Sequence, residues 1–103
     1  MNKHLFTVRI DFEDRTFAME QTTAETPTEA LRNVCQKAEA LAHYDKTALT
    51  EMLDNRIILT HLAGVRGVWN WHPKPIESEA TADIFGGNIV QTDENGPQRN
   101  GGA

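Results

Sequence analysis

Two histidines are the residues in this sequence whose type and spacing come closest to a chemical site. If residues 56–72 form a hairpin that turns at Arg66-Gly67, His61 and His72 share one face and lie opposite each other. Two imidazoles on neighbouring strands are half of a zinc site, which normally takes four ligands, or three and a water. No nearby cysteine or carboxylate completes the set. We therefore predict no bound metal, and His61 and His72 are the candidate ligands if one binds.

The other reactive side chains form no catalytic arrangement. Cys35 falls on the apolar stripe of a predicted helix, where burial keeps a thiol protonated and inert. Gly86-Gly87 lacks the length and the trailing lysine of a phosphate loop. The carboxylates at 11–14 lie near a predicted turn, and a chain of this size has difficulty enclosing a pocket for acid–base work. We expect no catalytic activity and no cofactor.

The elements that would position these residues begin with an alternating segment. Its apolar side chains fall on every second position, at Phe6, Val8, Ile10 and Phe12. This period of two predicts a half-buried strand. Phe17 and Met19 resume the pattern, and a loop with an even number of residues would place them on the face of Ile10. We predict an antiparallel hairpin over residues 4–22 with such a loop.

A helix start follows the hairpin. Thr26 can cap the helix, Pro27 suits its first position, and Glu29 can close a capping box. Apolar side chains continue at helical spacing, at Leu31, Val34, Cys35, Ala38, Leu41 and Ala42. We predict one amphipathic helix of four to five turns that ends near 43–44. Asp45 can cap a second, shorter helix that stops at Asn55.

A second hairpin is expected over residues 56–72. The turn is at Ala63-Gly64 or at Arg66-Gly67, and either position assigns the same side chains to each face of the sheet. This assignment places Trp69 and Trp71 on the helix side. Ile57, Leu59 and Val68 then share the opposite face. Three contiguous apolar side chains in water are an aggregation liability, so we expect something to cover them.

The cover is either residues 76–90 of the chain itself, with Ile84-Phe85, folded back over this face, or a second copy or another protein. We expect a self-associated dimer, because small domains often complete a core in this way and two-fold pairs are the commonest oligomer. Ile57, Leu59 and Val68 are therefore the predicted partner-binding residues.

Prolines 73 and 75 end the second hairpin, since neither can donate to a ladder. Residues 78–85 are compatible with a brief helix and 88–91 with a short strand. Together the elements predict an α+β domain over residues 1–91. It has the order ββα(α)ββ, with a small antiparallel sheet of about four strands and one long amphipathic helix on one face. Residues 92–103 are predicted to form a polar flexible tail that contributes nothing to folding.

The hairpin and capped helix of residues 5–42 resemble in outline the partial RNase-H-like domain of HicB-type antitoxins. In those domains a β-hairpin precedes a helix that starts Thr-x-x-Glu-Ala-Leu, which is here Thr26-Pro27-Thr28-Glu29-Ala30-Leu31. The resemblance covers under half of the chain, and the turn glycines and third strand of that family are absent before this helix. It implies a hairpin followed by a helix, and the chain is not assigned to the family.

Composition excludes several classes of function. The net charge is −5, and no basic stripe is present, so we expect no nucleic-acid binding. The start of the chain lacks the apolar core of a signal peptide, and no apolar run approaches the ~20 residues that span a bilayer. A single cysteine excludes an internal disulfide. We expect a cytoplasmic protein without a membrane segment.

Three features favour a role in binding another protein: a partly apolar second sheet face, an acidic polar tail and no site for chemistry. We expect a small acidic regulator or inhibitor that acts through protein–protein contacts and has no catalysis of its own. The alternative is a small-ligand or metal-binding protein, with or without enzyme activity, that uses His61, His72 and the strand of Trp69 and Trp71. A pocket lined by convergent polar groups would favour this alternative.

Overall fold

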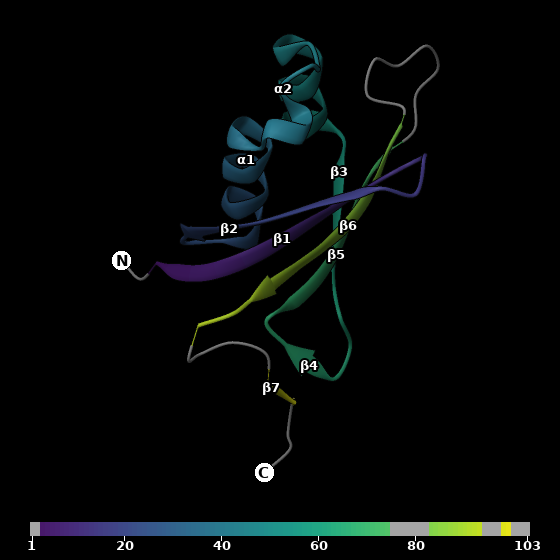
Figure 1. Ribbon diagram of the computed structural model, residues 1–103. Coiled ribbons are helices and arrows are strands. Elements are labelled where there is room, and N and C mark those ends of the chain that lie inside the picture. The colour runs from purple at the N-terminus through teal and green to yellow at the C-terminus, as the bar shows by residue number, and fades with distance from the viewer. Residues whose placement is uncertain (1–2, 75–82, 94–97, 100–103) are drawn as a thin grey trace.

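The computed structural model describes residues 3–74, 83–93 and 98–99. Figure 1 shows a sheet with two helices on one of its faces. The elements are β1 (His4–Phe12), β2 (Phe17–Ala24), α1 (Pro27–Lys37), a 3-10 turn η1 (Glu39–Leu41), α2 (Lys46–Asn55), β3 (Ile57–His61), β4 (Val65–Arg66), β5 (Val68–Pro73), β6 (Ile84–Gln91) and β7 (Gln98–Arg99).

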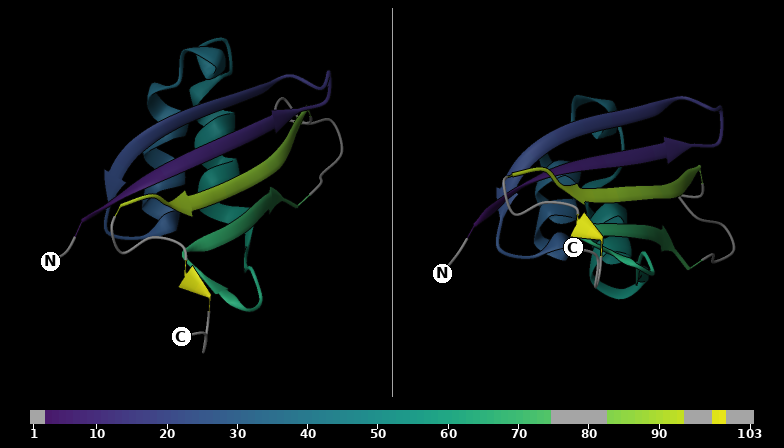
Figure 2. Two further views of the ribbon diagram at one scale, coloured as in Figure 1. Left: turned by 60° about the horizontal axis from the view of Figure 1, so that its bottom comes forward. Right: turned by 90° about the horizontal axis from the view of Figure 1, so that it is seen from below.

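Five strands form one antiparallel sheet in the order β2-β1-β6-β5-β3, and β4 pairs with β7 apart from it (Figure 2). The predicted α+β class with a small antiparallel sheet is therefore confirmed. Two details differ from the prediction: the sheet has five strands rather than about four, and the long helix is divided. None of the helices among the described residues is long and apolar enough to cross a membrane.

The cap and the first residue of α1 are as predicted, but its end is not. Thr26 accepts a hydrogen bond from the Glu29 N–H at 3.1 Å, and Pro27 is the first helical residue. The helix ends at Lys37 because Ala38 is extended, with φ −66° and ψ 125°. The chain then turns through η1, and Asp45 caps α2 by accepting from the Thr47 N–H. The break directs the side chains of the η1 region back onto the core instead of along one straight stripe.

The first hairpin has a three-residue loop, so the predicted even loop is wrong. Phe12 donates its N–H to the Thr16 carbonyl at 3.0 Å, and Arg15 takes the left-handed conformation with φ 71°. A residue in the left-handed conformation is usual at the end of a three-residue hairpin loop. The resulting register pairs Ile10 with Ala18. It places Phe17 on the face away from the core.

Strand β6 occupies the centre of the sheet, although only a short strand was expected at residues 88–91. It pairs with β1 on one side and with β5 on the other. Its ladder with β1 shifts register between Asp11 and Phe12. Gly86 lies beside this irregularity with φ 127°, and a Cβ there would lie 2.2 Å from the Trp71 carbonyl oxygen. The brief helix suggested for 78–85 falls largely outside the described residues, and its last two residues begin β6.

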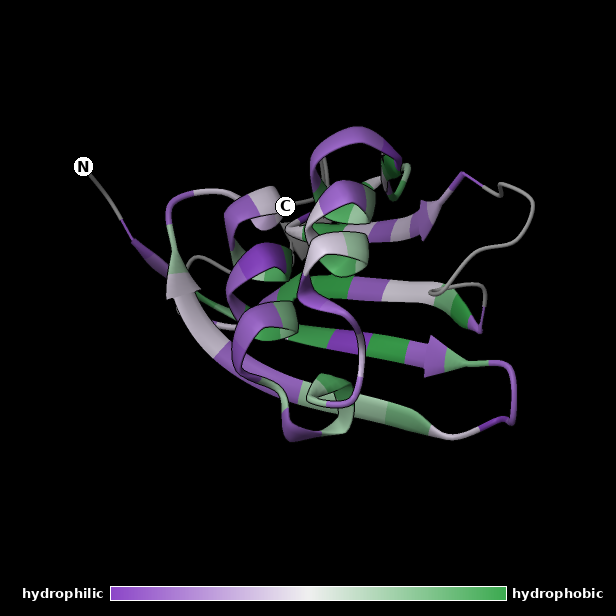
Figure 3. Cartoon of the chain, turned by 90° about the horizontal axis from the view of Figure 1, so that it is seen from above, coloured by the Kyte–Doolittle hydropathy of each residue, from purple (hydrophilic) through white to green (hydrophobic). Residues whose placement is uncertain are grey.

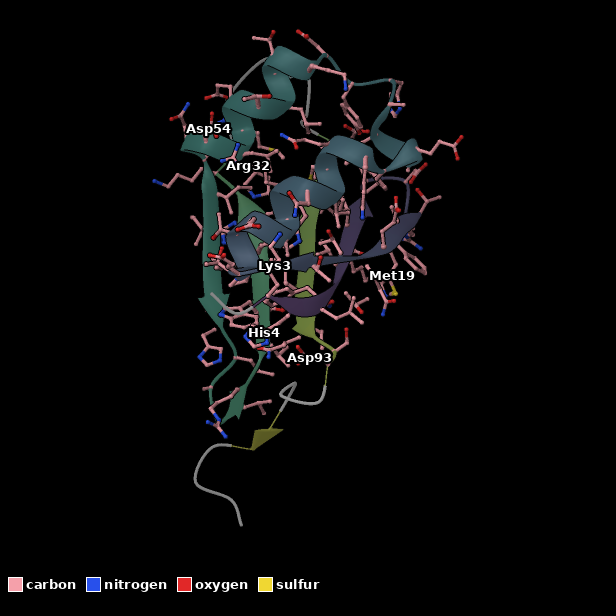
Figure 4. The ribbon with its side chains drawn as sticks, turned by 90° about the vertical axis from the view of Figure 1, so that its left-hand side faces the viewer. Lys3, His4, Met19, Arg32, Asp54 and Asp93 are labelled. Atoms are coloured by element: carbon pink, nitrogen blue, oxygen red, sulfur yellow. The ribbon has the colours of Figure 1, made fainter. Side chains whose placement is uncertain are left out.

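The core lies between the helices and one face of the sheet (Figure 3). Leu31, Val34 and Cys35 of α1 are buried there, as predicted from their helical spacing. The sheet contributes Phe6, Val8, Ile10, Trp71, Ile84 and Ile89. On the outer side of the helices, Arg32 of α1 and Asp54 of α2 form an ion pair at 2.6 Å that is labelled in Figure 4. Because both side chains are partly exposed, this pair contributes little stability.

The segment that follows β6 is bonded to the start of β1. Thr92 donates its N–H to the Leu5 carbonyl at 2.8 Å, and Asp93 Oδ2 lies 3.0 Å from His4 Nδ1. His4 and Asp93 lie close together in Figure 4. Farther along, Gln98–Arg99 pairs with β4. The remainder of residues 92–103 lies outside the described residues, and the domain boundary after residue 91 stays a prediction.

Candidate partner-binding edge of the sheet

The two candidate metal-ligating histidines lie on opposite faces of the sheet. His61 pairs with Trp69, and their rings stack with centroids 5.3 Å apart. His72 pairs with Ile58 and points the other way. Across the part of the chain that the structure describes, no three His, Cys, Asp or Glu side chains gather in a group that could hold a metal. The structure therefore does not bring the predicted pair together.

The three predicted partner-binding residues do not share a face. Ile57 and Leu59 pack against the core beneath the helices. Leu59 pairs with Trp71 and therefore shares its face of the sheet. The prediction that Leu59 and Trp71 lie on opposite faces is wrong. The connection is longer than a tight turn: Leu62 closes it by donating to the Val68 carbonyl, and Gly67 pairs with β6 through the Gln91 N–H. The helices supply the cover that Ile57 and Leu59 need.

The face of the sheet away from the helices, which we call the open face, is polar at its centre. One row crosses all five strands through Met19, Arg9, Asn88, Asn70 and Thr60. Val68 also points to this side, because it pairs with Val90 two positions from the Asn70–Asn88 pair. An antiparallel sheet with one packed face and one polar face is stable in water without further cover.

Among the described residues, four large apolar side chains are exposed, and two of them, Phe17 and Met19, lie together at the β2 edge of the open face; the others are Phe85 on β6 and Leu62 after β3. Phe17 is 53% exposed and Met19 is 51% exposed, although the alternation of the sequence placed both in the core. Figure 4 shows Met19 pointing outward at the margin of the sheet. The Arg9 guanidinium lies 4.1 Å from the centre of the Phe17 ring, and Arg9 Nε donates to Asp11 Oδ1 at 2.8 Å. Arg9 is thus held against one side of Phe17.

The backbone of β2 also has an outer edge. Because Phe12 bonds Thr16, the alternation of an antiparallel ladder directs the backbone groups of the odd-numbered residues of β2 away from β1. Side chains of α1 occupy two of these outward carbonyls: Lys37 Nζ donates to Gln21 O at 3.0 Å, and Asn33 Nδ2 donates to Thr23 O at 3.4 Å. Such capping protects an edge from unwanted pairing.

These hydrogen bonds cap only the second half of β2, at Gln21 and Thr23. Within the described residues, no side chain is bonded to the outward backbone groups of Phe17 and Met19. The uncapped backbone therefore coincides with the two exposed apolar side chains. We call this stretch, Phe17 to Met19, the free edge.

A cavity of about 520 Å³ lies on the other side of the molecule, between the end of α1, η1 and α2. Its floor is apolar and its rim is polar; the lining includes Cys35, Ala38, Leu41, Leu49, Leu53, Lys37, Glu39, Lys46 and Thr50. Burial raises the pKa of the Cys35 thiol to about 12, so it stays protonated and unreactive near neutral pH, as predicted. None of His61, His72, Trp69 and Trp71 lines this cavity.

Comparison with protein-family models, with curated proteins and with solved structures finds no match for this chain.

Proposed function

We propose that this protein acts by binding another protein chain along the free edge and has no catalysis of its own. The observation that carries the proposal is the coincidence of uncapped backbone with exposed apolar side chains at Phe17 and Met19. A partner strand added to a sheet edge gains affinity from main-chain hydrogen bonds and specificity from alternate side chains. The free edge offers both.

The free edge is also preorganised. The Arg9 guanidinium stacks on Phe17 and is itself fixed by Asp11, so the aromatic ring is held before a partner arrives. A group that is already ordered loses less conformational entropy on binding than a free side chain does. The polar centre of the open face adjoins this edge and supplies hydrogen-bonding groups for the rim of an interface.

The experiment that tests the proposal compares two charge substitutions at exposed apolar residues. The full chain, its Met19→Lys variant and its Leu62→Lys variant are immobilised, and proteins retained from extract of the native cells are identified by mass spectrometry. Leu62 is 42% exposed and follows β3, so it controls for the loss of a surface apolar group. We expect retention by the unmodified chain and by Leu62→Lys, and loss in Met19→Lys. Equal retention by all three would contradict the proposal.

A second candidate function is binding of a small apolar molecule in the helical cavity. Its volume of about 520 Å³ lies within the range of small-molecule sites, and its floor is apolar. Ala42 lines the cavity and is exposed, so Ala42→Trp should narrow the cavity without disturbing the core. Apolar probe molecules that raise the melting temperature of the unmodified protein, but not of Ala42→Trp, would support this function.

A further inference from the structure

We infer that the occupant of the free edge is a second copy of this chain, paired with it antiparallel about a two-fold axis at Ala18. This inference rests on the proposed function and names its partner. It would join two β2 strands, and thus two five-stranded sheets, into one continuous sheet. The backbone capping, the loop conformation and the side chains each limit the possible registers, and together they leave this one.

The capping by α1 limits pairing on one side. A two-fold axis at Met19 would oppose Phe17 to Gln21 of the second copy, whose carbonyl already accepts from Lys37. An axis farther along β2 would displace both Lys37 and Asn33. Registers centred beyond Ala18 therefore exchange existing hydrogen bonds for new ones and gain little.

The hairpin loop limits pairing on the other side. An axis at Phe17 would oppose Met19 to Arg15 of the second copy. Arg15 has φ 71° and cannot continue a strand in that conformation. Centring on Ala18 is the register in which Phe17 of each copy pairs with Met19 of the other. It uses the outward backbone groups of both residues and disturbs no capped carbonyl.

The side chains suit the same register. On the helix side of the sheet, Ala18 meets its own counterpart with little bulk, and Glu20 lies opposite Thr16. An axis at Glu20 would instead place two carboxylates directly opposite each other, which is destabilising. On the open face, each Phe17 ring lies beside a Met19 sulfur, a favourable contact. Four half-exposed apolar side chains are then buried together.

The geometry also sets the expected strength and size of the assembly. Both copies contribute the same strand, so the interface is isologous and closes at a dimer instead of continuing into a filament. The paired stretch is short, and interfaces below about 1,000 Å² are weak or transient. We therefore expect a dimer that forms in the high micromolar range and dissociates on dilution.

Sedimentation velocity of the full chain over roughly 10 µM to 1 mM tests the association, within the affinity range of a small interface. The unmodified chain and Leu62→Lys should shift from monomer to dimer with concentration, whereas Met19→Lys should remain a monomer. A dimer that persists in Met19→Lys would show that the contact lies elsewhere and would overturn this inference. A monomer at every concentration would also overturn it.

Disulfide trapping tests the register. The Ala18→Cys variant should form a disulfide-linked dimer under mild oxidation, because positions directly opposite in an antiparallel pair have Cβ atoms about 5 Å apart. Thr23→Cys, which is more exposed to solvent than Ala18 on the same strand, should not, and the unmodified chain with only the buried Cys35 is a second control. Equal cross-linking of both variants would refute the Ala18 axis.

The second copy as occupant and the partner-binding role of the free edge can be excluded separately. If the unmodified chain stays monomeric but Met19→Lys loses a different protein from cell extract, the second copy is excluded and the partner-binding role of the free edge is retained. If Met19→Lys changes neither self-association nor retention from extract, both the second copy as occupant and the partner-binding role of the free edge are excluded.

Discussion

The indole N–H of Trp71 donates a hydrogen bond to the backbone carbonyl of Arg9 at 3.1 Å. Trp71 lies on β5 and Arg9 on β1, so this bond crosses the intervening strand β6. Trp71 is 2% exposed, and the bond satisfies a donor that would otherwise be buried alone. The residue of β6 beneath it is Gly87, which pairs with Trp71. A Cβ at Gly87 would lie 1.9 Å from the Arg9 oxygen and 3.2 Å from the indole nitrogen.

Gly87→Ala should therefore destabilise the protein by about 3 kcal/mol, at the upper end of the cost of overpacking a core. Gly64→Ala is the matched control, since a Cβ at Gly64 meets nothing within 4 Å. Its cost should be about 1 kcal/mol, from the strain of an alanine at φ 81°. Urea unfolding of the two variants measures the difference. Equal midpoints would contradict the role assigned to Gly87.

The same strand shows why part of the fold was not predictable from the sequence. Strand β6 pairs with β1 across nearly the whole chain, Val8 with Ile89, and with β5 on its other side. Periodicity reports only local structure, and two glycines and a ladder irregularity interrupt the alternation of β6. By contrast, the helix start at Thr26 depends on neighbouring residues alone, and it was predicted correctly.

The face of the sheet on which each β2 side chain lies was the second feature that could not be predicted from the sequence, and it affected the candidate site. Counting apolar residues favoured Phe17 and Met19 on the core side of β2, but the loop with Arg15 in the left-handed region reverses the face. Ala18, a small residue, then packs against the core in their place. The length of a loop is fixed by backbone conformation, which alternation does not encode. The free edge was therefore not foreseen.

Leu31 offers a direct test of the helix as the centre of the core. It is 1% exposed, whereas Leu62 is 42% exposed. Leu31→Ala should lower the free energy of unfolding by about 2–5 kcal/mol, because it removes buried methyl groups and leaves a cavity. Leu62→Ala makes the same chemical change at the surface and should cost less than about 0.5 kcal/mol. Equal urea midpoints for the two variants would exclude this placement of α1.

Alkaline pH should destabilise the fold through Cys35. Its pKa is 9.0 when unperturbed and is raised by burial to about 12 in the folded chain. Between these values the unfolded chain has lost a proton that the folded chain retains, so the free energy of unfolding falls as pH rises. The expected slope approaches about 1.4 kcal/mol per pH unit between these two pKa values, and the effect fades as the pH falls below 9.

Tyr44 adds to this effect above pH 10. Its pKa is raised from 10.0 by burial and then by the hydrogen bond that its hydroxyl donates to Asp83 at 2.7 Å. Urea unfolding at pH 8 and at pH 10.5 measures the total, and Cys35→Ala and Tyr44→Phe separate the two contributions. Each variant should lose less stability than the unmodified protein between the two pH values. The same loss in all three would contradict the assignment.

The final prediction concerns the two residues after β6. Thr92 bonds the Leu5 carbonyl, and Asp93 accepts from the Leu5 N–H at 3.3 Å and lies against His4. A chain truncated after Gln91 loses these hydrogen bonds, each worth about 1 kcal/mol, so its melting temperature should fall by about 5–10 °C. A chain truncated after Asp93 retains them and should melt well above the shorter one. If both melt together at the temperature of the full chain, then residues 92–103 contribute nothing to folding and the domain ends at residue 91.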